Sequence, residues 1–426
     1  MLHSSEEMGK KLLLWALKYC IHEPPQRNLL LGHLLLHEGK AGLAELSFRK
    51  VLSEAQNPEL RIQARLGLAK ALSMRKALAE AEACLRQARE ELSDHPDLDL
   101  LAALADQEAD LYALQGKYFQ AEQCLEEAVR ELAKGEAKPG YRATLAFKLG
   151  LLLQQRLRHR RALTWLEEAE QLFGKEEKGE VPAALTKLVQ ASSLVALGKP
   201  AEALLRAEQA EALLTKQAVG PDISRAAVQV RALCLEALGR LAEAFALKEA
   251  CLSPESRAED FAELAVLAFS LGHPQKAKEY EERAVSLIKE TDTQACYALF
   301  QLAMMRGDVS RATTLFQRVL DELVGPLMSL EQQLKVRRAQ INLWIEQGEL
   351  EQARQATEAL QEELQKLEEE GADMEPFLLG LHELLGRLRS MEGDAESAIR
   401  HYRTCLELAQ GLGLPLDVAS AYANLG

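Results

Sequence analysis

Apolar and polar residues alternate along almost the whole chain with the period of amphipathic helices. One pattern recurs: a glycine, a short polar turn, an alanine five residues after the glycine, and an apolar residue four positions further on. The glycine fits the end of a helix, because a left-handed backbone is unfavourable for other residues. The alanine lets two helix backbones approach, and the apolar residue lies one turn along the same face. Each copy therefore predicts two antiparallel helices joined by a tight turn.

The marker alanine occurs ten times, with successive copies between 33 and 45 residues apart, and six copies carry a large apolar residue four positions further on. In two copies the turn glycine is replaced, once by Lys76 and once by Leu157. Since a helix pair of this kind buries its apolar face only against neighbouring pairs, the run predicts one solenoid instead of several globular domains. The alanines that mark the copies are Ala44, Ala81, Ala121, Ala162, Ala203, Ala244, Ala277, Ala312, Ala353 and Ala398.

The repeats resemble those of the tetratricopeptide repeat (TPR) family. The matching residues are the Leu-Gly pairs of the first helix (Leu31-Gly32, Leu149-Gly150 and Leu385-Gly386), the turn glycine, and the alanine and Leu or Phe of the second helix. Most copies are longer than the 34-residue standard, like the repeats of kinesin light chains or of MalT-type bacterial regulators. The resemblance implies an all-α, right-handed superhelical solenoid of about ten antiparallel helix pairs.

The two ends of the chain depart from the repeat pattern. We expect residues 1–24 to form an N-terminal capping helix, residues 25–413 to form the TPR-like repeats, and residues 414–426 to form the first half of a further repeat. A solenoid end normally needs a polar cap, so this last segment predicts a piece of a longer protein. The alternative interpretation is that the last helix is itself the cap.

The composition agrees with a helical protein and disfavours some classes of binding partner. The 426 residues include 51 basic and 65 acidic ones, for a net charge of −14, which disfavours nucleic acid and anionic membranes as partners. Apolar residues make up 48% of the chain, and glycine and proline are scarce. No uncharged apolar run is long enough to span a membrane, and seven scattered cysteines suit a reducing compartment. We therefore expect a cytoplasmic protein.

No catalytic or metal-binding motif is complete. Phosphate-binding glycine loops and nucleophile elbows do not occur. His382 and Glu383 begin a near match to the zinc motif H-E-x-x-H, but Gly386 stands where the second histidine is needed. His33 and His37 share one helix face without an evident third ligand. We therefore predict no enzyme activity, no cofactor and no metal site.

A basic segment, Arg156–Arg161, contains five basic or titratable residues in six positions. One interpretation is that it contacts RNA or an acidic partner. The other is that these residues stabilise the C-terminal end of a helix, where positive charge is favoured.

The resemblance places the first helix of each pair on a concave face, so positions there are candidates for partner binding. Counting back from Gly348 by six, ten and thirteen residues gives Asn342, Arg338 and Lys335, and Arg387 takes the place of Asn342 in the next repeat. Arginine and asparagine can bind the carboxylate and backbone of a peptide. These residues predict a partner site, with a solvated groove as the alternative.

Together these patterns predict a non-catalytic protein-protein interaction scaffold that binds a peptide or helix of a partner in its concave groove. The alternative is the sensory or regulatory TPR arm of a larger bacterial signalling protein or transcription regulator, whose output domain lies beyond residue 426. The uncapped C-terminal end also suggests self-association.

Overall fold

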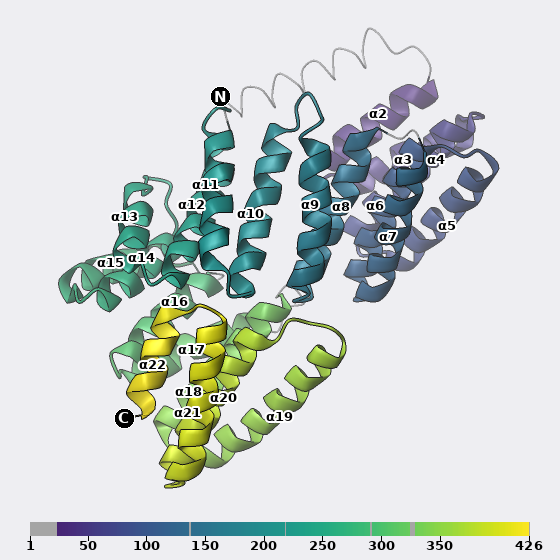
Figure 1. Cartoon of the computed structure of the whole chain (residues 1–426). Coiled ribbons are helices and arrows are strands. Elements are labelled where there is room, and N and C mark those ends of the chain that lie inside the picture. Colours follow the sequence, from purple (N-terminus) through teal and green to yellow (C-terminus); the bar gives the residue numbers. More distant parts are fainter. Residues whose placement is uncertain (1–23, 136–137, 218, 290–291, 324–328, 426) are drawn as a thin grey trace. The chain divides into compact units, whose positions relative to one another are not determined.

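The computed structural model describes residues 24–135, 138–217, 219–289, 292–323 and 329–425. These residues form 21 α-helices and no strand (Figure 1). The predicted capping helix lies almost entirely outside the described residues. None of the described helices is long and apolar enough to cross a membrane.

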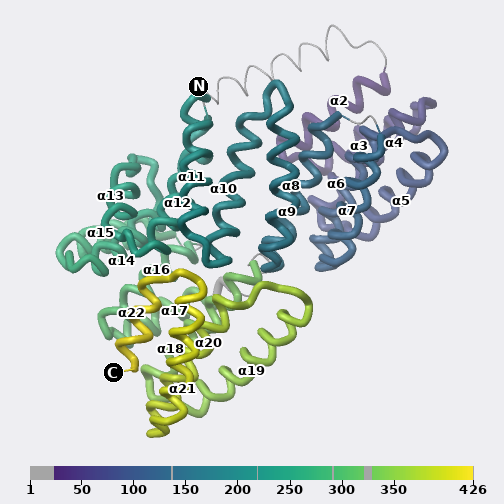
Figure 2. Tube along the Cα trace, viewed as in Figure 1, coloured from purple at the N-terminus to yellow at the C-terminus, as the bar shows by residue number. Residues whose placement is uncertain are grey.

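The helices follow one another as ten consecutive pairs and one further helix, α22 (Pro415–Leu425). Figure 2 shows how each chain segment turns back after a helix to form the next one. The predicted all-α solenoid of about ten helix pairs is thereby confirmed. The pairs are α2 (Pro24–His37) with α3 (Ala41–Glu54), α4 (Pro58–Met74) with α5 (Leu78–Asp94), α6 (Leu98–Leu114) with α7 (Tyr118–Lys134), α8 (Pro139–Gln155) with α9 (His159–Phe173), α10 (Glu180–Ala196) with α11 (Pro200–Leu214), α12 (Pro221–Ala237) with α13 (Leu241–Ala250), α14 (Ala258–Ser270) with α15 (Pro274–Leu287), α16 (Thr293–Met305) with α17 (Val309–Leu323), α18 (Leu330–Gln347) with α19 (Leu350–Glu369), and α20 (Glu375–Met391) with α21 (Ala395–Gly411).

The chain divides into two compact units. The first contains the described residues up to Leu152 together with Trp165–Gly179, and the second contains Leu153–Thr164 and Glu180–Gly426. The turn between α8 and α9 thus belongs to the second unit, although most of both helices belongs to the first.

The turns inside the pairs keep one backbone conformation even where the sequence departs from the pattern. At Gly348 the φ angle is 78°, in the left-handed region that glycine adopts easily. The two copies without glycine keep this conformation, with φ of 61° at Lys76 and 58° at Leu157. Lys76 is exposed, whereas Leu157 is completely buried. The local strain is therefore tolerated for different reasons at the two positions.

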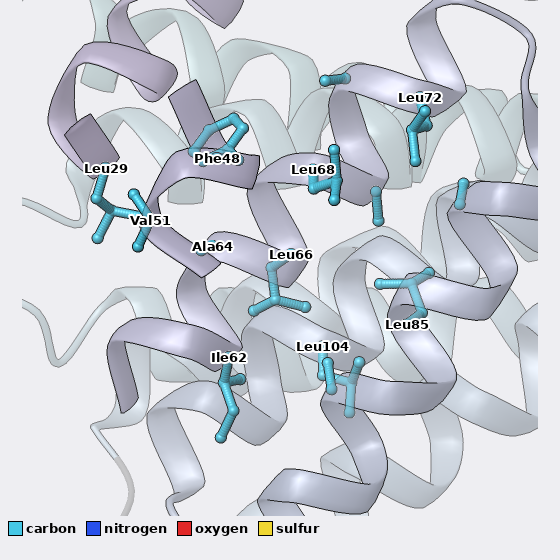
Figure 3. Packing of buried hydrophobic residues seen from close by; sticks show 14 of the residues in the cluster. Leu29, Phe48, Val51, Ile62, Ala64, Leu66, Leu68, Leu72, Leu85 and Leu104 are labelled. Atoms are coloured by element: carbon cyan, nitrogen blue, oxygen red, sulfur yellow. The ribbon is translucent and has the colours of Figure 1, made fainter. Parts of the chain in front are cut away.

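The core of the first unit shows why the repeat pattern needs glycine in the first helix. Phe48 of α3 lies fully buried between α2 and α4, surrounded by leucines (Figure 3). A Cβ atom on Gly32 would lie 2.6 Å from Cε1 of Phe48, and a Cβ atom on Gly67 would also overlap the Phe48 ring. Gly386 and Tyr402 repeat this arrangement in the second unit, where a Cβ atom on Gly386 would lie 2.5 Å from Cε1 of Tyr402. The Leu-Gly signature thus makes room for a ring from the second helix.

One buried polar residue of α10 predicts a stabilising substitution. Gln190 is 1% exposed, and neither its amide nitrogen nor its oxygen has a hydrogen-bond partner within the described structure. Burying such groups without partners costs about 1–3 kcal/mol. Gln190→Leu is therefore expected to raise the free energy of unfolding of the second unit by about this amount, measured by urea denaturation.

The matched control for that variant is Gln154→Leu on α8. The Gln154 amide donates to the carbonyl of Val189, at 3.5 Å, so it already has a partner. We expect no stabilisation from the control. Equal effects of the two substitutions would contradict the explanation.

Candidate partner-binding site

Three of the four predicted partner residues lie on helix α18 and the fourth lies on α20, all within the second unit. Helix α18 begins at a capping box, in which the Ser329 hydroxyl accepts from the Gln332 amide at 3.2 Å and the Gln332 side chain accepts from the Ser329 amide at 3.1 Å. It ends at Gly348. The capping box and Gly348 fix where α18 begins and ends, and therefore which face of the helix carries each of the three residues. Helices α18 and α20 pack against each other.

Asn342 and Arg387 are brought together, as their equivalent positions in successive repeats suggested. Nη1 of Arg387 donates to Oδ1 of Asn342 at 2.6 Å. The other guanidinium nitrogen of Arg387 forms an ion pair with Glu346 of α18. These contacts tie α18 to α20 and orient the guanidinium plane.

The side chain of Arg338 extends from α18 toward α20. Its Nη2 atom is 3.8 Å from Oε2 of Glu383, at the outer limit of an ion pair, and its side chain is 46% exposed. The Arg338 side chain runs over Gly380, where a Cβ atom would overlap the guanidinium. Arg338 is therefore a half-exposed cation whose ion pair with Glu383 is loose.

Tyr297 of α16 lies near enough for the charge of Arg338 to act on its hydroxyl. Burial raises the pKa of the Tyr297 hydroxyl, while the positive charge of Arg338 and a hydrogen bond with Gln301 act in the opposite direction. The hydroxyl therefore stays protonated at neutral pH and can donate a hydrogen bond. Three successive first helices, α16, α18 and α20, thus contribute polar groups around Arg338.

Lys335 does not join this group. Its Nζ atom lies 2.6 Å from Oε1 of Glu331, one turn earlier on the same helix, and its side chain is 56% exposed. Exposed pairs of this kind contribute little to stability. The role of Lys335 in partner binding therefore stays a prediction.

The sequence analysis did not assign Glu383 and Tyr297 to the partner site beside Arg338, although the signal was present. Glu383 stands ten residues before Gly393, and Tyr297 stands ten residues before Gly307, the same spacing that selected Arg338. Applying this rule to every repeat would have found both. No spacing rule shows that Glu346 pairs with Arg387, because that contact depends on how two helices pack.

The remaining sequence candidates form other contacts. His382 lies with its Nδ1 atom 3.0 Å from Nδ1 of His401 on α21, and the His33 ring packs edge-to-face against Phe48 with centroids 5.2 Å apart. Among the described residues, no cluster of three or more His, Cys, Asp or Glu side chains is arranged to hold a metal ion. The basic segment Arg156–Arg161 faces an acidic loop of the same chain, so its acidic partner is internal.

No protein-family model and no curated protein matches the sequence. Solved structures do match. A Rap protein complexed with competence and sporulation factor is 15% identical, with 91% of this chain and 98% of that one covered and a TM-score of 0.52. The apo form of RapI is 12% identical over the same shares, with a TM-score of 0.53.

A third similar structure is a signal transduction ATPase with numerous domains (STAND) that has a tetratricopeptide repeat sensor, from Pyrococcus horikoshii. It is 13% identical, with 66% of this chain and 43% of that one covered and a TM-score of 0.55. Likeness at these identities concerns the fold. With ten helix pairs among its described residues, a left-handed backbone at the turn residue of each pair and rings packed against glycines, the chain is a repeat protein with the tetratricopeptide-type fold.

Proposed function

We propose that this protein is a non-catalytic scaffold that binds a peptide or helix of a partner protein at the face formed by α16, α18 and α20. The observation that carries the proposal is the state of Arg338. It is half-exposed, its ion pair with Glu383 is long at 3.8 Å, and its charge acts on the hydroxyl of Tyr297 on the neighbouring helix α16. A partner carboxylate can displace Glu383 at low cost, because the existing pair is weak.

The Asn342–Arg387 pair supplies the second element of the site. A side-chain amide can satisfy the backbone of an extended peptide, and Arg387 holds Asn342 in place. The structurally similar Rap protein is complexed with competence and sporulation factor, which supports a ligand-binding role for a fold of this type.

A peptide library tests this function. We would screen twelve-residue peptides with free C-terminal carboxylates against matching amidated peptides and measure the affinity of selected peptides by calorimetry. The double variant Lys335→Glu/Arg338→Glu is expected to weaken binding of the selected carboxylate peptide by about 2 kcal/mol or more, roughly thirtyfold. Helicity measured by circular dichroism should not change.

The control for charge is Arg354→Glu/Arg400→Glu. The Arg354 side chain is 43% exposed and that of Arg400 is 64% exposed, and their ion pairs are with carboxylates of their own helices. This control changes the net charge by the same amount away from the site. Unchanged peptide affinity in the Lys335/Arg338 variant, or equal loss in the control, would contradict the proposed site.

A second candidate function is a sensory or regulatory arm of a larger signalling protein. The similarity to a STAND protein with a tetratricopeptide repeat sensor favours it. Sequencing the gene past codon 426 tests this idea. A reading frame that continues into an ATPase or DNA-binding domain would support it, and a stop codon would count against it.

Self-association through the C-terminal end also remains a prediction. Leu416 and Tyr422 of α22 are 48% and 57% exposed. Sedimentation equilibrium of the wild type and of Tyr422→Glu measures whether this helix joins two copies. A monomeric wild type would contradict it.

A further inference from the structure

Within the second unit, the turn between α8 and α9 contacts the loop between α19 and α20, which follows more than 200 residues later in the sequence. Repeats in a solenoid normally contact only their neighbours. We call this contact the seam. It consists of Arg156–Arg161 on one side and Glu370–Glu375 on the other.

The seam has an apolar centre. Leu157 is completely buried and packs in one cluster with Leu334, Leu367 and Met374 of the distant repeats. Its carbonyl oxygen accepts a hydrogen bond of 2.7 Å from the Asp373 amide. A leucine at this turn, where other repeats have glycine, is therefore explained by burial against a remote repeat.

Ionic contacts surround this centre. Asp373 is 6% exposed, accepts a hydrogen bond of 2.9 Å from the Arg160 amide and forms an ion pair with the Arg160 guanidinium. That guanidinium also lies 2.5 Å from Oε1 of Glu375. Arg158 donates to the Glu370 carbonyl at 2.6 Å, and Arg156 lies 3.5 Å from the Glu370 carboxylate.

Part of this ionic network is open to solvent. The Arg160 side chain is 63% exposed and that of Glu375 is 37% exposed. Burial acts most strongly on the pKa of Glu375 and would raise it, but the hydrogen bond and charge of Arg160 together with a backbone hydrogen bond outweigh burial, so the pKa is lowered. Salt screens the attraction between charges that are in contact with water. It does not weaken the apolar packing of the buried Leu157 in this way.

Two further turns continue the same edge. A Cβ atom on Gly198, in the turn between α10 and α11, would lie 2.5 Å from Cα of Leu412 at the end of α21. A Cβ atom on Gly239, in the turn between α12 and α13, would lie 3.3 Å from Cγ of Pro415. Three successive turns thus meet the last helices of the unit in order.

We propose that the seam is an ionic latch that ties the turn between α8 and α9 and the repeats of α10–α13 to those of α19–α22, within the second unit, and opens as one unit. Its acidic side lies directly before α20, the helix that carries Glu383 and Arg387. Opening the latch therefore frees α20 to shift against α18 and changes the spacing of groups around Arg338. This consequence for the partner site rests on the proposed function, whereas the latch itself does not.

Hydrogen exchange measured by mass spectrometry tests the latch without a ligand. The variant Asp373→Asn/Glu375→Gln removes two of its carboxylates. We expect amide exchange at residues 156–161 and 370–375, and also at the turns around Gly198 and Gly239, to accelerate at least tenfold. Raising NaCl from 50 to 500 mM should accelerate the same segments in the wild type. Residues 258–287 should not respond.

The control variant is Glu351→Gln/Glu396→Gln, which removes two exposed carboxylates that pair only within their own helices in the contacts described here. It should leave exchange in the seam unchanged. Acceleration confined to residues 370–375, or seam exchange that responds neither to the substitutions nor to salt, would overturn the latch. The salt titration uses the wild-type protein, so it tests the latch even if Asp373→Asn/Glu375→Gln folds poorly.

The library peptide selected above then tests the link to the partner site. We expect its affinity to change at least threefold in Asp373→Asn/Glu375→Gln and to stay constant in the control. An unchanged affinity together with accelerated exchange would show that the latch opens without affecting α20, which contradicts the link. If no peptide binds even the wild type, the proposed function fails, while the exchange data still decide whether the latch exists.

Discussion

Replacing Leu157 with glycine is expected to lower the free energy of unfolding of the second unit by about 2–4 kcal/mol, although glycine is the residue that this turn prefers. Leu157 has a φ of 58° and is completely buried in the seam. Glycine would relieve about 1–2 kcal/mol of backbone strain. Removing a buried leucine side chain costs about 2–5 kcal/mol, and glycine loses still more apolar surface, so the loss prevails.

Lys76 provides the matched comparison for this prediction. It has nearly the same backbone, with a φ of 61°, but its side chain is exposed. Lys76→Gly should therefore stabilise the first unit by about 1 kcal/mol. Urea denaturation followed by hydrogen exchange in each unit measures both effects, since a solenoid need not unfold in one step. Changes of the same sign at the two positions would refute this account of the turns.

Phe48→Ala is expected to destabilise the first unit by about 3–5 kcal/mol, the cost of emptying a packed aromatic site. The Phe48 ring is completely buried between Gly32 and Gly67, so neither flanking helix can close the gap without moving its backbone. Gly67→Ala should also destabilise the unit, by about 1–3 kcal/mol, because its methyl group would overlap the ring.

The double variant Phe48→Ala/Gly67→Ala separates this mechanism from a general loss of helix stability. Once the ring is gone, the alanine methyl group fills part of the cavity, so the combined loss should be smaller than the sum of the single losses. Thermal denaturation of the four proteins measures this coupling. Additive losses would show that Gly67 is needed for a reason other than room for Phe48.

Local patterns were sufficient for the fold class. Helix boundaries depend on short-range signals such as the turn glycine and the small alanine, and both act within one helix pair. The same repeat pattern singled out Gly32 and Gly386 in its Leu-Gly pairs, and the packing of Phe48 and Tyr402 against them explains why glycine stands there. Because each helix pair carries the same local sequence pattern, the number of pairs could be counted from the sequence.

The sequence predicted equivalent positions for the candidate residues, but not the contacts that each of them forms. A fixed spacing from the turn glycine placed Asn342 and Arg387 at equivalent positions, and they form a hydrogen bond. Which cations are already neutralised was not predictable. Arg387 is held by Glu346, Lys335 pairs within its own helix, and Arg338 is only loosely paired. Such differences arise from the register between helices, which the sequence of one repeat does not contain.

The sequence by itself determined the period, the paired helices and the face on which polar groups gather, since these follow from interactions a few residues apart. Only the tertiary structure decided the role of Leu157 and of the arginines beside it. Both depend on a loop more than 200 residues away in the sequence. A contact over such a distance in the sequence depends on how whole helices pack, which patterns of a few residues do not contain.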